Sequence, residues 1–66
     1  LDFLVDNSVI LEIKKGNKQN MSDIKQVLMH LKTTKLKLGI LAYFGSNGVT
    51  YKRIINNDSR ISQTNS

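Results

Sequence analysis

The chain opens with LDFLVDNSVILEIK (residues 1–14), and this stretch decides the fold. Two runs rich in strand-forming residues, Leu1–Val5 and Val9–Lys14, flank a short polar segment. That segment is Asp6, Asn7 and Ser8, all good turn formers. The stretch therefore predicts two short strands joined as a hairpin.

The register of this hairpin decides where its charged side chains lie. A three-residue loop, which is a common hairpin connection, pairs Leu4 with Ile10 and Asp2 with Glu12. Because side chains alternate between the two faces of a strand, Lys14 shares a face with Glu12. The opposite face then carries six apolar side chains, namely Leu1, Phe3, Val5, Val9, Leu11 and Ile13.

Two carboxylates directly opposite each other repel when both are ionised, and a divalent cation relieves that repulsion. Magnesium prefers oxygen ligands and keeps several waters. Asp2, Glu12 and the backbone carbonyl of Ile13 are therefore candidate ligands of Mg²⁺ or Mn²⁺. Lys14 would stand near the attacking water or the scissile phosphate of a substrate. The alternative, which the spacing alone leaves open, is a solvated edge on which these side chains are ordinary surface charges.

A helix is predicted after the polar loop that follows Lys14. Either Ser22 or Asn20 can cap its start, and it should end near Lys32 or Thr33. The apolar residues of this segment recur at helical spacing, at Ile24, Val27, Leu28 and Leu31.

Two further strands complete the predicted order β-β-α-β-β. Leu36–Phe44 is rich in strand formers and is expected to be buried, whereas Val49–Ile55 is expected to be edge-like. Residues 56–66 are polar and without apolar periodicity, which predicts a disordered tail. The sequence thus predicts an α+β fold, a mixed sheet with one helix packed on it, in one domain over residues 1–55.

Composition narrows the function classes. Ten Lys and Arg against five acids give a net charge of +5, which favours a polyanionic partner such as nucleic acid. There is no cysteine, and a single histidine cannot build a structural zinc site. No segment resembles a signal peptide or a membrane span, so we expect a cytoplasmic protein without a membrane partner. The residues offer no Ser-His-Asp or Cys-His set and no phosphate-binding glycine loop.

Four segments, in order and suitably spaced, resemble one family. They are LDFLV (1–5), VILEIK (9–14), QVLMHLK (26–32) and LKLGILAYFGS (36–46). They resemble the GxxExxR proteins, a branch of the PD-(D/E)XK nuclease superfamily, over about residues 1–55. The resemblance implies a central mixed sheet flanked by helices and magnesium-dependent hydrolysis of nucleic-acid phosphodiester bonds.

The resemblance also implies roles for single residues. Asp2 matches the first acid of the motif, and Glu12 with Lys14 matches its E-x-K element. Gln26 matches the glutamine of a Q-x-x-x-Y element, where it would orient Lys14 or bind the substrate backbone. His30 stands at the tyrosine position, a departure, although histidine can still donate to a phosphate.

Three lysines, Lys15, Lys18 and Lys25, follow the motif and could contact phosphates. The alternative is that they serve only solubility, as lysines in loops and on exposed helix faces often do.

The motif that names the family, on an N-terminal helix, does not occur in this sequence. We therefore expect a truncated core whose sheet has one bare apolar face. Such a face usually finds a partner, so we expect self-association or a missing N-terminal segment that covers the sheet. Two rival hypotheses are a non-catalytic nucleic-acid-binding or assembly module of the same fold and a small basic domain with a structural role.

Overall fold

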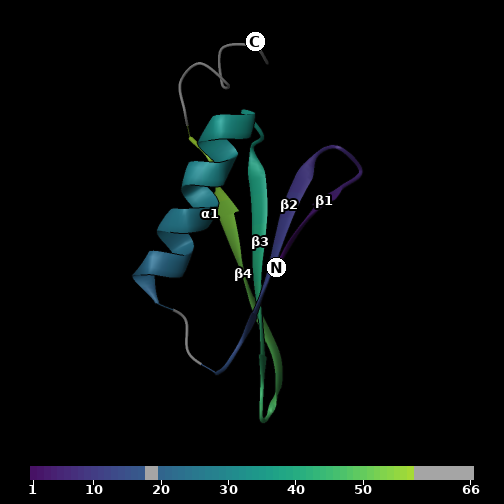
Figure 1. The fold of residues 1–66 in the computed structure, drawn as a ribbon, viewed down its shortest axis with the longest axis vertical. Coiled ribbons are helices and arrows are strands. Elements are labelled where there is room, and N and C mark those ends of the chain that lie inside the picture. The colour runs from purple at the N-terminus through teal and green to yellow at the C-terminus, as the bar shows by residue number, and fades with distance from the viewer. Residues whose placement is uncertain (18–19, 58–66) are drawn as a thin grey trace.

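The computed structural model describes residues 1–17 and 20–57 (Figure 1). A hairpin of β1 (Asp2–Val5) and β2 (Val9–Lys15) leads into helix α1 (Met21–Thr34). A second hairpin of β3 (Leu38–Gly45) and β4 (Gly48–Ile55) follows it. The predicted α+β class and the order β-β-α-β-β are confirmed.

The four strands form one mixed sheet in the order β1-β2-β3-β4. The two hairpins are antiparallel, and β2 pairs with β3 in parallel. A parallel pair needs a long crossover connection, which α1 supplies. Since α1 packs against β2, β3 and β4, it covers one face of the sheet (Figure 1). None of the described helices is long and apolar enough to cross a membrane.

The first hairpin has the predicted register. Asp2 lies opposite Glu12, and Leu4 lies opposite Ile10. Asp6 and Asn7 adopt positive φ angles of 55° and 53° in the turn. These residue types enter that region at lower cost than most, because a short polar side chain can hydrogen-bond locally. The turn chemistry thus fixes the register, and the register places the acids.

Helix α1 is capped by Asn20, one of the two predicted caps. The side chain of Asn20 accepts a hydrogen bond from the backbone of Asp23 at 3.0 Å, and the hydroxyl of Ser22 donates to the same oxygen. The helix continues to Thr34, slightly past the predicted end, and Lys35 then adopts a φ of 62°.

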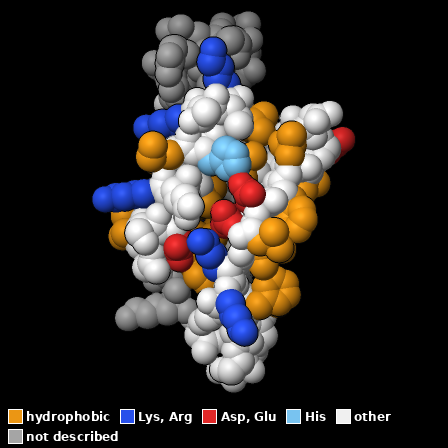
Figure 2. All heavy atoms as spheres, viewed as in Figure 1, with side chains coloured by type: hydrophobic (Ala, Val, Ile, Leu, Met, Phe, Trp, Pro, Cys, Tyr) orange, Lys and Arg blue, Asp and Glu red, His pale blue; other side chains and the backbone are white. Residues whose placement is uncertain are grey.

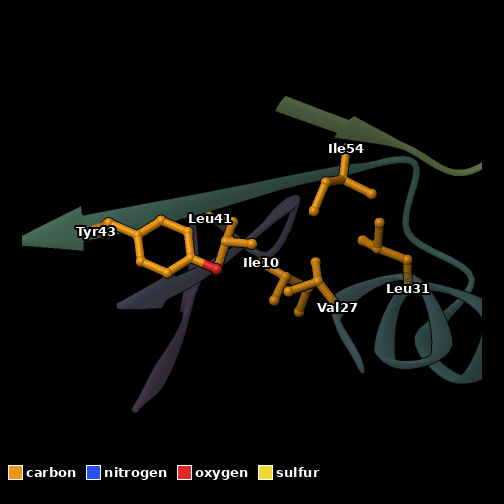
Figure 3. Close-up of a cluster of buried hydrophobic side chains, with 6 residues drawn as sticks. All are labelled: Ile10, Val27, Leu31, Leu41, Tyr43 and Ile54. Carbon is orange, nitrogen blue, oxygen red and sulfur yellow. The ribbon is translucent and has the colours of Figure 1, made fainter. Parts of the chain in front are cut away.

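The core lies between α1 and the sheet, on the face that also carries Glu12. Figure 3 shows its buried side chains, with the ring of Tyr43 at one end of the cluster. They are Ile10, Val27, Leu31, Leu41, Tyr43 and Ile54. Nothing in the described residues covers the opposite face, where Phe3, Phe44 and Tyr51 are exposed. Among the described residues, this face of the sheet is thus apolar and uncovered.

The predicted strand from Leu36 begins two residues later, at Leu38. Leu36 instead packs against the core as a partly buried residue. Asn56, assigned from the sequence to the polar tail, is buried, and its side chain donates to the carbonyl of Leu36 at 3.1 Å. Residues 58–66 of the predicted tail lie outside the described residues.

At Gly39, side chains of α1 lie close against the backbone of the sheet. A Cβ atom at this position would lie 2.7 Å from Val27 Cγ1 and 3.2 Å from Leu31 Cδ1. Because Val27 is β-branched and stiff, Gly39→Ala should destabilise the fold by about 1–3 kcal/mol. Urea denaturation would measure this, and adding Val27→Ala should recover part of the Gly39→Ala loss. A double-mutant cycle without coupling would contradict the close approach.

Candidate active site

Acidic and basic side chains gather between α1 and the first hairpin, on the face of the sheet that α1 covers. Figure 2 shows acidic side chains beside the histidine and a basic side chain on this face. Asp2 and Glu12 are paired across β1 and β2, and Lys14 follows on the same face. Glu12 is only 7% exposed. The alternative of a fully solvated edge therefore does not hold at Glu12.

The carboxylate of Glu12 forms an ion pair with the nitrogen of Leu1. Oε2 of Glu12 accepts a hydrogen bond from the Leu1 ammonium at 2.8 Å. The same ammonium lies 3.5 Å from the carbonyl oxygen of Ile13. Two of the three oxygen donors predicted to bind metal thus converge on one positive charge.

The other predicted metal ligand, Asp2, pairs with the helix. Its Oδ2 lies 3.0 Å from Nδ1 of His30, and both side chains are more than 40% exposed. The sequence analysis gave His30 a substrate-binding role, and the structure places it on Asp2 instead of leaving it free. This contact links α1 to the edge strand β1.

Lys14 reaches two acceptors on α1. Its Nζ donates to Oε1 of Gln26 at 3.5 Å and lies 3.8 Å from Oδ1 of Asp23. The structure thus brings Lys14 and Gln26 together, as their suggested partnership requires. Asp23 was not among the predicted site residues.

Tyr43 connects Asp23 to the core, and the sequence analysis gave it no site role either. Its hydroxyl donates to Oδ2 of Asp23 at 2.5 Å. Burial, followed by this hydrogen bond, raises the pKa of the Tyr43 hydroxyl above its ordinary value, which keeps it protonated as a donor. The sequence held one signal that Asp23 could belong to the site, namely its position one helical turn before Gln26 on the predicted helix. That Tyr43 and Lys14 are neighbours becomes known only from the register in which β2 and β3 pair.

The structure describes two of the three remaining predicted phosphate contacts, Lys15 and Lys25. Lys15 is exposed and, by strand alternation, lies on the other face of the sheet from Lys14. Lys25 is exposed on α1. Lys18 lies outside the described residues.

The donor set suits a hard divalent cation. The available ligands are two carboxylates and one backbone carbonyl, all oxygen, and such cations complete their coordination with water. Oε2 of Glu12 and the carbonyl oxygen of Ile13 lie 2.8 Å and 3.5 Å from the same nitrogen, so these two oxygens are close together. Within residues 1–17 and 20–57, no three or more His, Cys, Asp or Glu side chains gather as a metal site of their own.

Comparison with known proteins gives one match. A family model described as the PD-(D/E)XK nuclease superfamily matches residues 1–54, most of the chain. Neither the curated proteins nor the solved structures give a match. The matched range holds both strands of the acidic hairpin, helix α1 and all but the last residue of the second hairpin. The chain belongs to the PD-(D/E)XK nuclease superfamily.

Proposed function

We propose that this chain is a nuclease-like domain that hydrolyses nucleic-acid phosphodiester bonds with Mg²⁺ or Mn²⁺. The observation that carries the proposal is the pairing of Asp2 with Glu12 beside Lys14 in a chain of this superfamily. Asp2, Glu12 and the Ile13 carbonyl would hold the metal.

The charges at the site favour a divalent ion. Asp2, Glu12 and Asp23 bring three carboxylates to this face, and Lys14 brings one positive charge. Three carboxylates against one lysine leave two negative charges, which one divalent cation balances. When bound, the ion supplies Lewis-acid stabilisation and an activated water.

The chain's own residues would handle the substrate. Lys14 would offset the charge that builds on the attacked phosphate, and Gln26 would orient Lys14. His30 would release Asp2 to the metal and turn to a phosphate. Lys15, Lys18 and Lys25 are proposed contacts to the nucleic-acid backbone, in keeping with the net charge of +5.

Three finer assignments belong to the same proposal. The chain is proposed to be a member of the GxxExxR branch, because its four segments resemble that branch. A second copy of the chain or a covering segment is proposed to lie on the bare apolar face, where Phe3 and Tyr51 are exposed. The compartment is proposed to be the cytoplasm.

Metal binding is tested by titrating Mg²⁺ and then Mn²⁺ into the wild type and Glu12→Gln. Backbone amide shifts report the site without any assay of activity. Saturable Mg²⁺ shifts are expected at Asp2, Glu12, Ile13 and Lys14, and paramagnetic Mn²⁺ should broaden the same signals. Glu12→Gln should abolish both effects, because it removes the charge of the buried ligand and leaves its size unchanged.

Asp6→Asn is the matched control, because it makes the same chemical change at an exposed turn acid. It should bind the metal as the wild type does. An absence of localised shifts in the wild type at millimolar metal would refute the metal site.

One observation favours the rival function, a non-catalytic module that binds nucleic acid. The contact of His30 with Asp2 engages one of the two carboxylates that a metal needs. Such a module would show salt-sensitive affinity for DNA or RNA without any metal requirement. Binding measured with and without a chelator distinguishes the two functions.

A further inference from the structure

We propose that Asp23, held by Tyr43, is a positioning residue that fixes the ammonium of Lys14 beside Glu12. The catalytic effect of this positioning rests on the proposed function. The arrangement itself can be tested without any activity.

Three elements of the fold meet at Asp23. Lys14 comes from β2, and Tyr43 lies opposite it on β3 in the parallel register. Asp23 comes from the first turn of α1. The sheet thus sets the spacing of Lys14 and Tyr43, and the helix brings a carboxylate to both.

The two oxygens of Asp23 have different partners. Oδ2 accepts the Tyr43 hydroxyl at 2.5 Å, and Oδ1 lies 3.8 Å from Nζ of Lys14. A hydrogen bond to a carboxylate is short and strong when its donor is well placed. Tyr43 is well placed, because its side chain is only 2% exposed and is held in the core.

The backbone of Asp23 is held as well. Its N–H donates to the capping oxygen of Asn20 at 3.0 Å. A carboxylate fixed at its backbone and at one oxygen has little freedom left for the other oxygen. Oδ1 of Asp23 is therefore a stationary acceptor toward Lys14.

Lys14 needs such an acceptor, because a lysine side chain is long and loses considerable rotamer entropy when held in one place. Its side chain is 30% exposed, so solvent competes for the ammonium. Gln26, at 3.5 Å, is a neutral acceptor from the next turn of α1. Asp23 adds the charge, and together they hold the ammonium on the face that carries Glu12.

A simpler role for Asp23 is to stabilise α1 as an acid in its first turn. That role needs neither the Tyr43 hydroxyl nor Lys14. Removing only the Tyr43 hydroxyl therefore separates the two roles. It should disorder Lys14 if Asp23 positions that side chain, and it should leave Lys14 unchanged if Asp23 only stabilises the helix.

The test follows the Lys14 side chain by NMR in the wild type, Tyr43→Phe and Asp23→Asn. We expect the order parameter of the Lys14 ammonium to fall and its two ε protons to become equivalent in both variants. Tyr51→Phe is the matched control, because it removes the hydroxyl of an exposed tyrosine, and it should leave Lys14 unchanged. Amide shift dispersion checks that each variant is folded. A wild-type Lys14 order parameter in folded Tyr43→Phe and Asp23→Asn would overturn the proposal.

Kinetics provide a second readout. In metal-dependent hydrolysis, Tyr43→Phe should lower kcat by about 10-fold to 100-fold and leave KM nearly unchanged, as a displaced catalytic group does. An unchanged kcat in a variant with a disordered Lys14 would overturn the catalytic part of the proposal. A wild type without hydrolysis, whose Lys14 still loses order in Tyr43→Phe, would overturn the proposed function and uphold the positioning.

Discussion

Leu41→Ala is expected to lower the free energy of unfolding by about 2–5 kcal/mol, the cost of a large-to-small change in a packed core. Leu41 is 0% exposed and lies between α1 and the sheet. A domain of this size buries a limited core, and its total stability is typically on the order of 3–10 kcal/mol. The variant should therefore be largely unfolded at moderate temperature. Urea denaturation followed by circular dichroism measures the loss.

Leu4→Ala supplies the control for this prediction. It removes the same atoms from a side chain on β1 that is 55% exposed, so its cost should stay below about 1 kcal/mol. Equal losses at the two positions would mean that the core does not lie beneath α1. Because Leu41 is also opposite Glu12 in the β2–β3 register, its loss should loosen the site as well.

The first hairpin could be predicted from the sequence because its determinants are local. Asp6, Asn7 and Ser8 define the turn, and the loop length then pairs Asp2 with Glu12. The helix was predictable for the same reason, since its cap and its apolar stripe lie within one segment. Local signals therefore explain the elements and the acidic pair.

The placement of α1 on the sheet could not be predicted in this way. Both faces of the first hairpin carry apolar side chains, and the face with six of them is the one left bare. The helix lies on the other face, where Gly39 leaves room for Val27 and Leu31. The contacts of His30 with Asp2 and of Asp23 with Tyr43 and Lys14 depend on that placement. They join residues far apart in the sequence and leave no local pattern.

Lys14→Met is expected to lower kcat for metal-dependent hydrolysis by about 100-fold to 1,000-fold, the cost of removing one well-placed electrostatic group from an active site. Methionine keeps much of the length of the side chain and loses the charge. Metal binding should persist, because Lys14 is not a ligand and its loss removes a positive charge beside Glu12. Steady-state kinetics at saturating Mg²⁺ measure kcat, and the amide titration measures the metal affinity.

The matched control for this change is Lys52→Met, at an exposed lysine of β4 to which no role at the site is assigned. Both variants lose one positive charge, so a general weakening of attraction to nucleic acid should raise KM similarly in each. Only the variant at Lys14 should lose kcat. Equal kcat values in the two variants would leave Lys14 as one more surface charge, and the contacts with Gln26 and Asp23 would then serve only the packing of α1 on β2. A loss confined to Lys14, with metal affinity retained, would separate its catalytic charge from the carboxylates that hold the ion.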